Sequence, residues 1–221
     1  YQDASSDTAD VVFCVGKDEK EYKAHKSILS HRCKMLYEIA RECDRKERFN
    51  HPIVINSIRE EVFKAILDFA YTVKCPVPES KDFAKELLVA SDRVGCVKLK
   101  LFVESFIADK FLAPENAAEL LLLADSRSCA LLKEAATNMF VLNPESVKKG
   151  EAWYQVFQSN RLITECLDAL SHSNNISDEK GSTTEDCATM NVATLPNKIH
   201  DENLELEDYA TMNVATLRNK L

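Results

Sequence analysis

The sequence contains few glycines and no closely spaced cysteines, and both absences exclude common kinds of functional site. Its four glycines, Gly16, Gly95, Gly150 and Gly181, are too far apart to form a P-loop, a dinucleotide-binding loop or a nucleophile elbow. The closest two of its eight cysteines are ten positions apart, so no C-x-x-C pair is present to anchor a zinc ribbon or a redox motif. We therefore expect no catalytic residues and no cofactor.

Long apolar runs and an excess of positive charge are also absent. No run approaches the roughly 18 apolar residues that span a bilayer, so we expect no membrane anchor. Residues 1–10 lack the basic and apolar regions of a signal peptide. The net charge is -8, and residues 171–221, with nine acids and four bases, carry most of it. Neither part of the chain offers the basic surface that phosphate backbones attract, which argues against nucleic acid as the main partner.

Most of the cysteines lie among apolar neighbours, which is typical of reduced, buried thiols in a cytoplasmic or nuclear protein. The densest group of potential metal ligands is His25, His31 and Cys33. A metal site is one alternative there, but the sequence offers no fourth ligand nearby. We interpret His25 as a residue of a strand-to-helix turn whose ring satisfies a backbone group. No bound metal is expected.

The first third of the chain has the hydrophobic pattern of a small sheet. Short apolar runs at residues 11–15 and 53–55 and an alternating segment at residues 21–25 predict three strands, of which the first two form a hairpin. Residues 26–39 lie between the hairpin and the third strand and are helical in composition, and the predicted order of elements is a hairpin, a helix pair and a strand. Their apolar positions include Met35 and Ile39, which we expect to face a core.

From residue 59 onward, apolar residues recur every three or four positions, which predicts a series of helices packed against the sheet and one another. Ser80 and Ser159 suit N-caps, and Pro114 suits the first turn of a further helix. Each apolar stripe is interpreted as core and not as a ligand site. The predicted fold class is therefore α+β, with most of the chain helical.

Residues 171–221 differ in composition from the rest of the chain. They begin as a polar linker, and a motif at residues 185–195 then returns at residues 207–217, with a period of 22 residues. Two copies with so few apolar residues cannot bury a core alone. We predict either a flexible tail or the beginning of a further unit.

Several segments resemble, in order, the signature motifs of the BTB/POZ family. Residues 10–13 and 22–29 are similar to its patterns D-[VI]-x-[FL] and F-x-A-H-[KR]-x-[VI]-L. Residues 62–72 are similar to E-x-F-x-x-[ML]-L-x-[FY]-[IL]-Y-T, and residues 87–93 to L-L-x-A-A-D-[KR]. The resemblance implies a BTB/POZ fold, in which a small three-stranded sheet is flanked by helices, over residues 8–111.

The next segment narrows the resemblance. Residues 112–126 are similar to the helical extension of the MATH–BTB group that includes the speckle-type POZ protein, where it forms the 3-box and the start of a BACK region. The resemblance therefore extends to about residue 170. It implies a BTB/POZ domain at 8–111, an all-α 3-box/BACK-like extension at 112–170, and an acidic, flexible tail with the duplicated motif at 171–221.

Proteins of this family act as adaptors, so the resemblance implies a homodimer that binds a cullin-3-type scaffold and brings an unidentified protein substrate to a ubiquitin ligase. The cullin-contacting φ-x-E motif of the family falls on Ala40, Arg41 and Glu42, although Ala40 is smaller than the usual φ residue. Glu42 is alternatively an ordinary exposed acid. Asp10 and His25 match family positions that shape the dimer-facing core.

A second function stays open at this point. A BTB/POZ scaffold that oligomerises a transcriptional or structural complex, without a ligase, also fits the motifs and is favoured by the small Ala40. Residues 1–221 contain no recognisable MATH or kelch domain, so we expect any substrate-reading domain outside this range.

Overall fold

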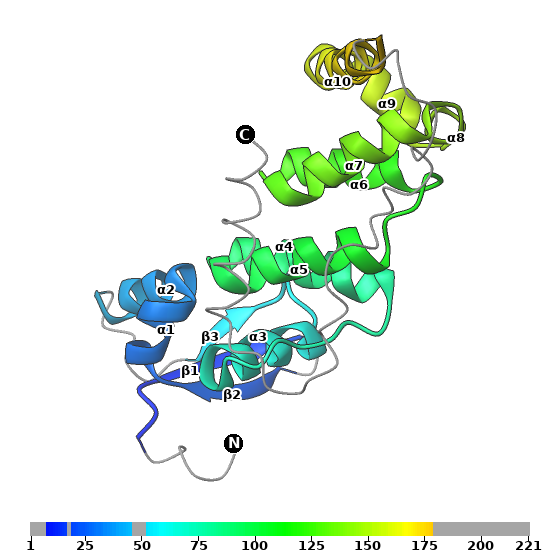
Figure 1. The fold of residues 1–221 in the computed structure, drawn as a ribbon. Helices are drawn as coiled ribbons and strands as arrows, with labels where there is room; N and C mark the ends of the chain where they lie inside the picture. Colours follow the sequence, from blue (N-terminus) through cyan, green and yellow to red (C-terminus); the bar gives the residue numbers. More distant parts are fainter. Residues whose placement is uncertain (1–7, 17–18, 46–51, 179–221) are drawn as a thin grey trace. The chain divides into compact units, whose positions relative to one another are not determined.

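A small mixed sheet forms from the first apolar segments of the chain, with its strands in the order β2–β1–β3 (Figure 1). β1 (Val11–Val15) pairs antiparallel with β2 (Lys20–Ala24) and parallel with β3 (Ile53–Ile55). Gly16 follows β1 with a φ of 80°, a conformation that glycine adopts without a steric penalty. The three predicted strands are confirmed, with β2 beginning and ending one residue earlier than the pattern indicated.

The structure, a computed structural model, describes residues 8–16, 19–45 and 52–178. Its fold class is α+β, with a three-stranded sheet flanked by helices and a helical extension after it, as predicted. No helix in the described ranges is long and apolar enough to cross a membrane. The duplicated motif of the tail lies outside these residues.

Two helices, α1 (Lys26–Arg32) and α2 (Lys34–Arg45), follow the hairpin. The composition predicted helix across this segment, and the structure interrupts it at Cys33, where φ is -132° and ψ is 70°. Leu29 and Leu36 are buried on either side of this break. The chain therefore turns between the two helices and keeps an apolar residue of each in the core.

Three longer helices complete the first part of the chain: α3 (Glu60–Thr72), α4 (Lys81–Arg93) and α5 (Val97–Lys110). The Ser80 hydroxyl accepts a hydrogen bond from the N–H of Phe83 at 3.2 Å, which confirms the predicted N-cap of α4. Residues from the sheet and from these helices share one core. Its largest fully buried side chains include Phe13, Phe63, Phe69, Leu87, Leu88 and Leu99.

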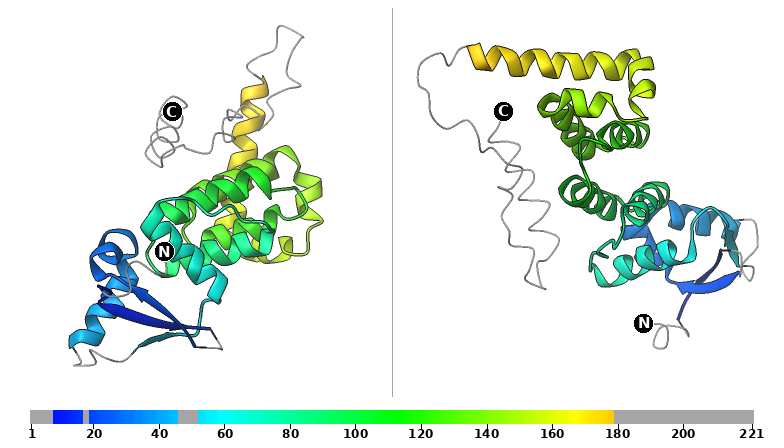
Figure 2. Two further views of the ribbon diagram at one scale, coloured as in Figure 1. Left: turned by 90° about the horizontal axis from the view of Figure 1, so that it is seen from below. Right: turned by 90° about the vertical axis from the view of Figure 1, so that its right-hand side faces the viewer.

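Five helices form the extension: α6 (Ala117–Ser126), α7 (Ala130–Leu142), α8 (Pro144–Lys148), α9 (Trp153–Gln158) and α10 (Asn160–Asp178). The helices α6 and α7 lie side by side, and α10 packs on α7 (Figure 2). Pro114 was expected in the first turn of a helix. It lies instead in the turn that precedes α6. The helix α10 continues past residue 170, the boundary assigned from composition.

Candidate protein-interaction surface

One face of α2 exposes apolar side chains beside an acid. Met35, Ile39 and Glu42 occur at i, i+4 and i+7, a spacing that places them on the same side of a helix. Met35 is 48% exposed and Ile39 is 41% exposed, although the sequence placed both among core positions. Large apolar residues that remain in solvent side by side are typical of surfaces that bind another protein.

The three residues predicted to contact a cullin divide between core and surface. Ala40 is buried, with 1% of its surface exposed. Arg41 and Glu42 are exposed and form ion pairs with Glu38 at 3.6 Å and Arg45 at 3.8 Å, respectively. Such solvent-exposed pairs contribute little to stability, so both side chains can exchange partners at low cost. The segment thus offers its polar side chains to a partner and keeps its alanine in the core.

The N-terminal part of α5 also exposes apolar side chains. Val97 is 63% exposed, and Leu101, one turn later, is 44% exposed. Gly95, just before this helix, packs closely against α2, because a Cβ at Gly95 would lie 3.0 Å from the Cγ of Met35. A larger residue would not fit there, and the φ of 71° at Gly95 also favours glycine.

We name these residues together the α2–α5 surface, which consists of Met35, Ile39, Glu42, Val97 and Leu101. Sequence reasoning had found only Glu42 among them. The i, i+4, i+7 spacing of the first three was a signal for a shared face, but it could not show whether that face was covered.

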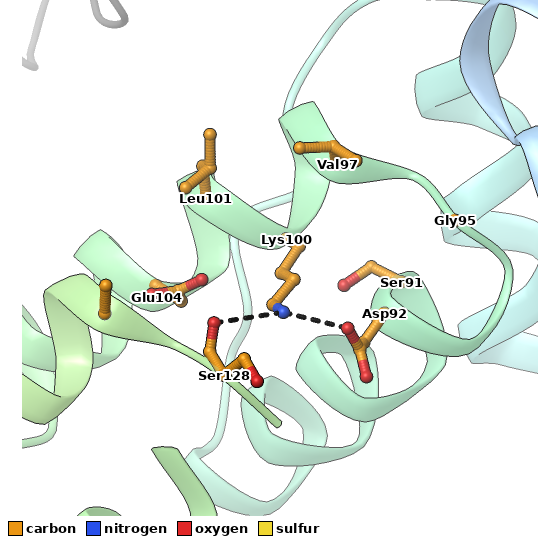
Figure 3. A pocket seen from close by; sticks show the side chains of 9 residues that line it. Ser91, Asp92, Gly95, Val97, Lys100, Leu101, Glu104 and Ser128 are labelled. Atoms are coloured by element: carbon orange, nitrogen blue, oxygen red, sulfur yellow. Dashed lines mark hydrogen bonds and ion pairs between the residues drawn. The ribbon is translucent and has the colours of Figure 1, made fainter. Parts of the chain in front are cut away.

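A hollow beside α5 is lined by Lys100, whose ammonium lies between Asp92 and Ser128 (Figure 3). The Lys100 ammonium donates to Asp92 Oδ1 at 2.8 Å and to the carbonyl oxygen of Arg127 at 2.6 Å. Burial lowers the pKa of Lys100, but the hydrogen bond with Asp92 and nearby negative charges outweigh this effect, so its pKa is raised overall. Lys100 is therefore a charged link between α4 and the turn before α7.

Glu104 lies beside this hollow and is almost fully buried, at 1% exposure. Burial raises the pKa of its carboxyl, while the N–H groups of Leu132 and Leu131 bond to it and oppose that shift. Its Oε2 atom has no hydrogen-bond partner within the described residues. Glu104 thus caps the N-terminus of α7 from α5 and connects the first part of the chain to the extension.

Asp10 and His25, predicted to shape the core, hold the start of α1 in place. Asp10 Oδ1 accepts a hydrogen bond from the N–H of Lys26 at 2.7 Å, at the N-terminus of this helix. The His25 ring bonds to the Tyr71 hydroxyl at 2.8 Å and to the Thr8 hydroxyl at 2.9 Å. The ring was expected to bond the backbone; its partners are hydroxyl groups. A role of these residues in a dimer stays a prediction.

No three potential ligands converge on a metal-sized site in the ranges that the structure covers. His25 is bonded as above, and the His31 ring bonds to the carbonyl oxygen of Ser27 at 2.9 Å, within its own helix. Cys33 is fully buried. His25, His31 and Cys33 therefore do not form a ligand cluster, and both histidine rings bond to other groups.

Residues 2–111 match the family model of the BTB/POZ domain. The match agrees with the three-stranded sheet flanked by helices and identifies this part of the chain as a BTB/POZ domain. BTB/POZ domains are protein-interaction domains that are generally non-enzymatic and commonly dimerise.

Similar proteins include two from Mus musculus. TD and POZ domain-containing protein 4 is 31% identical over 157 residues, which are 71% of this chain and 42% of the relative. TD and POZ domain-containing protein 1 is 32% identical over 151 residues, 68% of this chain and 41% of the relative. The solved BTB domain of zebrafish PATZ1 is 26% identical, covers 45% of this chain and 75% of that chain, and has a TM-score of 0.37.

The chain spans about two fifths of the length of the curated relatives it matches. An alignment of 157 residues is longer than the segment 2–111, so the similarity continues into the helices that follow the BTB/POZ domain.

Proposed function

We propose that the chain is a dimeric, non-catalytic adaptor that binds a cullin-3-type scaffold through the α2–α5 surface and presents a protein substrate for ubiquitination. The observation that carries the proposal is the exposed set Met35, Ile39 and Glu42 on one face of α2. It lies where the resemblance to the BTB/POZ family puts the cullin contact. The similarity to BTB/POZ proteins supports a role in protein interaction. The role in a ubiquitin ligase goes beyond that similarity.

The buried Ala40 changes how such a contact would be made. Its side chain faces the core and cannot enter a pocket on a partner. Ile39 and Met35 flank it on the exposed face and supply the apolar contact in its place, while Glu42 supplies the acid. Burying a side chain of this size stabilises a complex by roughly 1.5–3 kcal/mol before the cost of ordering it.

Calorimetry with the N-terminal region of a cullin-3-type protein tests this assignment. We expect measurable binding by the unsubstituted chain and at least a tenfold loss of affinity, about 1.4 kcal/mol, for Ile39→Asp and for Glu42→Lys. Leu142→Asp is the matched control, because Leu142 is also exposed, at 66%, but lies on α7. No heat of binding at about 50 µM, with the protein folded, overturns the ligase role.

Self-association is the second part of the proposal. A stable dimer buries about 1,200–2,000 Å² of surface in total. Multi-angle light scattering should give twice the chain mass of 24.9 kDa at micromolar concentration. A value equal to one chain would contradict the dimer.

A scaffold that oligomerises other proteins without a ligase is the second candidate. The inward-facing Ala40 favours it, because the φ position then offers nothing to a cullin. This candidate predicts a dimer in light scattering together with no cullin affinity in calorimetry, so the two measurements separate the candidates.

Two narrower assignments belong to the same proposal. We place the chain in the MATH–BTB group, supported by the residues 112–126 that resemble its extension. We also place it in the cytoplasm or nucleus, where the free thiols of its described cysteines stay reduced. Microscopy of the tagged chain in cells would test the second statement, and secretion of the tagged chain would contradict it.

A further inference from the structure

Two buried cysteines meet where the turn between α1 and α2 packs against the start of α5. Cys33 separates α1 from α2, and Cys96 directly precedes α5. The N–H of Met35 donates to the carbonyl oxygen of Val94 at 3.1 Å, and a Cβ at Gly95 would lie 3.1 Å from the Met35 nitrogen. The two backbone segments are therefore in direct contact.

The thiols of this pair are also bonded to each other. Cys33 is 0% exposed and Cys96 is 1% exposed. A hydrogen bond joins their side chains, and no disulfide is formed between them in the structure. Disulfides need cysteines whose backbones are near and whose side chains meet, and the contact between the two backbone segments and the interaction of the two thiols favour such a bond here.

The two thiols differ in acidity. Their shared hydrogen bond raises the pKa of Cys33 and lowers the pKa of Cys96. The N–H of Leu99 and the charge of Arg32 also lower the pKa of Cys96, against the effect of burial. The lowered pKa favours Cys96 over Cys33 as the sulfur that ionises first, and the thiolate is the form of cysteine that attacks electrophiles.

Three other cysteines lack the lowered pKa of Cys96. Burial raises the pKa of Cys75 and of Cys129 to about 12, and that of Cys166 to about 11. Those thiols stay protonated near neutral pH and react slowly. The Cys33–Cys96 pair is therefore distinguished from these three by the contact between its thiols and by the lowered pKa of Cys96.

We propose that Cys33 and Cys96 form a redox-active dithiol that hydrogen peroxide converts to a disulfide. The Cys96 thiolate attacks one peroxide oxygen, the O–O bond breaks, and a sulfenic acid forms as hydroxide leaves and takes up the proton that Cys96 released. The Cys33 sulfur then attacks the Cys96 sulfur. The S–S bond forms, the S–O bond breaks, and water leaves with the Cys33 proton. Two thiols and one peroxide give one disulfide and two waters, and two electrons pass from sulfur to oxygen.

The position of the pair gives the reaction a structural consequence. Because both thiols are buried, the reaction requires a local opening of the α1–α2 turn that admits peroxide, which is small and uncharged. The disulfide would fasten this turn to the start of α5, where Met35 already contacts Val94 and Gly95. It would also close a covalent loop between residues 33 and 96, which restricts the unfolded chain.

Peptide mapping by mass spectrometry under non-reducing conditions tests the proposal on the full 221-residue chain. After treatment with hydrogen peroxide, we expect one cross-linked peptide pair, joined through Cys33 and Cys96 and separated again by dithiothreitol. The thermal midpoint of the oxidised protein should rise by roughly 5 °C. Cys166→Ala is the matched control and should leave the cross-link unchanged, because Cys166 is buried elsewhere, in α10.

Two substitutions assign the roles. In Cys33→Ala, the sulfenic acid on Cys96 has no resolving thiol, so dimedone should label Cys96. In Cys96→Ala, Cys33 should stay unlabelled. The proposal fails if the peroxide-treated protein keeps both thiols free, if other cysteines pair in preference, or if dimedone labels Cys33 and not Cys96. Circular dichroism checks that each variant folds, and the map of the unsubstituted protein decides the question where a variant does not.

Discussion

The BTB/POZ domain and the helical extension bury different kinds of side chain. In the domain, Phe13 on β1 and Tyr22 on β2 contact Phe63 of α3 edge to face, with ring centroids 5.6 and 5.5 Å apart. These residues are far apart in sequence, so the core forms only when the strands and α3 come together. The packing of β1, β2 and α3 against one another therefore depends on the Phe63 ring.

The extension buries a larger share of alanine than the domain, and its core joins helices that are neighbours in sequence. Most of its core cluster lies on consecutive helices, and it contains one large aromatic, Phe140, stacked on Trp153 at 4.9 Å. Its buried alanines allow helices to approach closely: Ala117, Ala118, Ala124 and Ala136. The comparison teaches that the first part should be sensitive to removed volume and the second to added volume.

The largest effect is expected from Phe63→Ala. Phe63 is fully buried, and its removal leaves a cavity among Phe13, Tyr22 and the helices. We expect a loss of about 3–5 kcal/mol in the free energy of unfolding, measured by urea denaturation. Phe157→Ala is the control and should change stability by less than about 0.5 kcal/mol, because Phe157 is 61% exposed. Equal effects of the two would contradict the aromatic core.

A smaller effect is expected from Ala136→Leu in the extension. Ala136 is 1% exposed on α7, so the extra carbons have no room and the packed helices must move apart. The expected cost is about 1–3 kcal/mol by the same denaturation. Asn138→Leu adds the same side chain on an exposed position of α7 and should be nearly neutral. If Ala136→Leu left the free energy of unfolding unchanged, the core of the extension would tolerate added volume, and the proposed difference between the two regions would be wrong.

Much of the fold could be predicted because the pattern and the motifs agree. The strands at 11–15 and 53–55 and the Ser80 cap depend on nearby residues, which the sequence displays directly. The helix pair after the hairpin was predicted, but the position of its break at Cys33 was not, since the neighbours of Cys33 on both sides favour helix.

The candidate site was predicted less well for a similar reason. Motif spacing singled out Glu42 as a contact residue, which stays a prediction, and spacing cannot tell an exposed apolar face from a buried one. Met35 and Ile39 were therefore assigned to a core, and Ala40 was assigned to a contact surface that its buried side chain does not reach. The Cys33–Cys96 pair, 63 positions apart, had no signal in the sequence at all.

Glu104 connects the two regions and should make their stability depend on pH. Burial raises the pKa of this carboxyl in the folded protein above its ordinary value of 4.5, so the folded state holds the proton more tightly than the unfolded chain. Its stabilising contribution is present below pH 4.5 and is lost as the pH rises through the folded pKa. Urea denaturation from pH 4.5 to 7 should show this loss.

Substitutions at Glu104 sharpen the same comparison. Glu104→Gln keeps an acceptor for the N-terminus of α7 without a charge, so its stability relative to the unsubstituted protein should improve as the pH rises. Glu104→Ala removes both the acceptor and the titrating carboxyl, so it should cost about 1 kcal/mol near pH 4.5 and less as the pH rises. Glu134→Gln, on an exposed part of α7, should leave the pH profile unchanged. A Glu104→Gln profile parallel to that of the unsubstituted protein would contradict the assignment.

The smallest effect is expected at an ion pair that also joins the two regions. Lys85 Nζ of α4 lies 2.5 Å from Glu119 Oε1 of α6, and the Glu119 side chain is 44% exposed. A double-mutant cycle of Lys85→Met and Glu119→Gln should give a coupling energy of about 0.5 kcal/mol at low salt and almost none at 1 M salt, because water and ions screen such pairs. Lys81→Met, whose ammonium lies 3.7 Å from Glu119, is the control and should couple more weakly. A coupling above about 2 kcal/mol that persists in salt would mean that charge, and not the burial of apolar side chains and Glu104, holds the extension to the BTB/POZ domain.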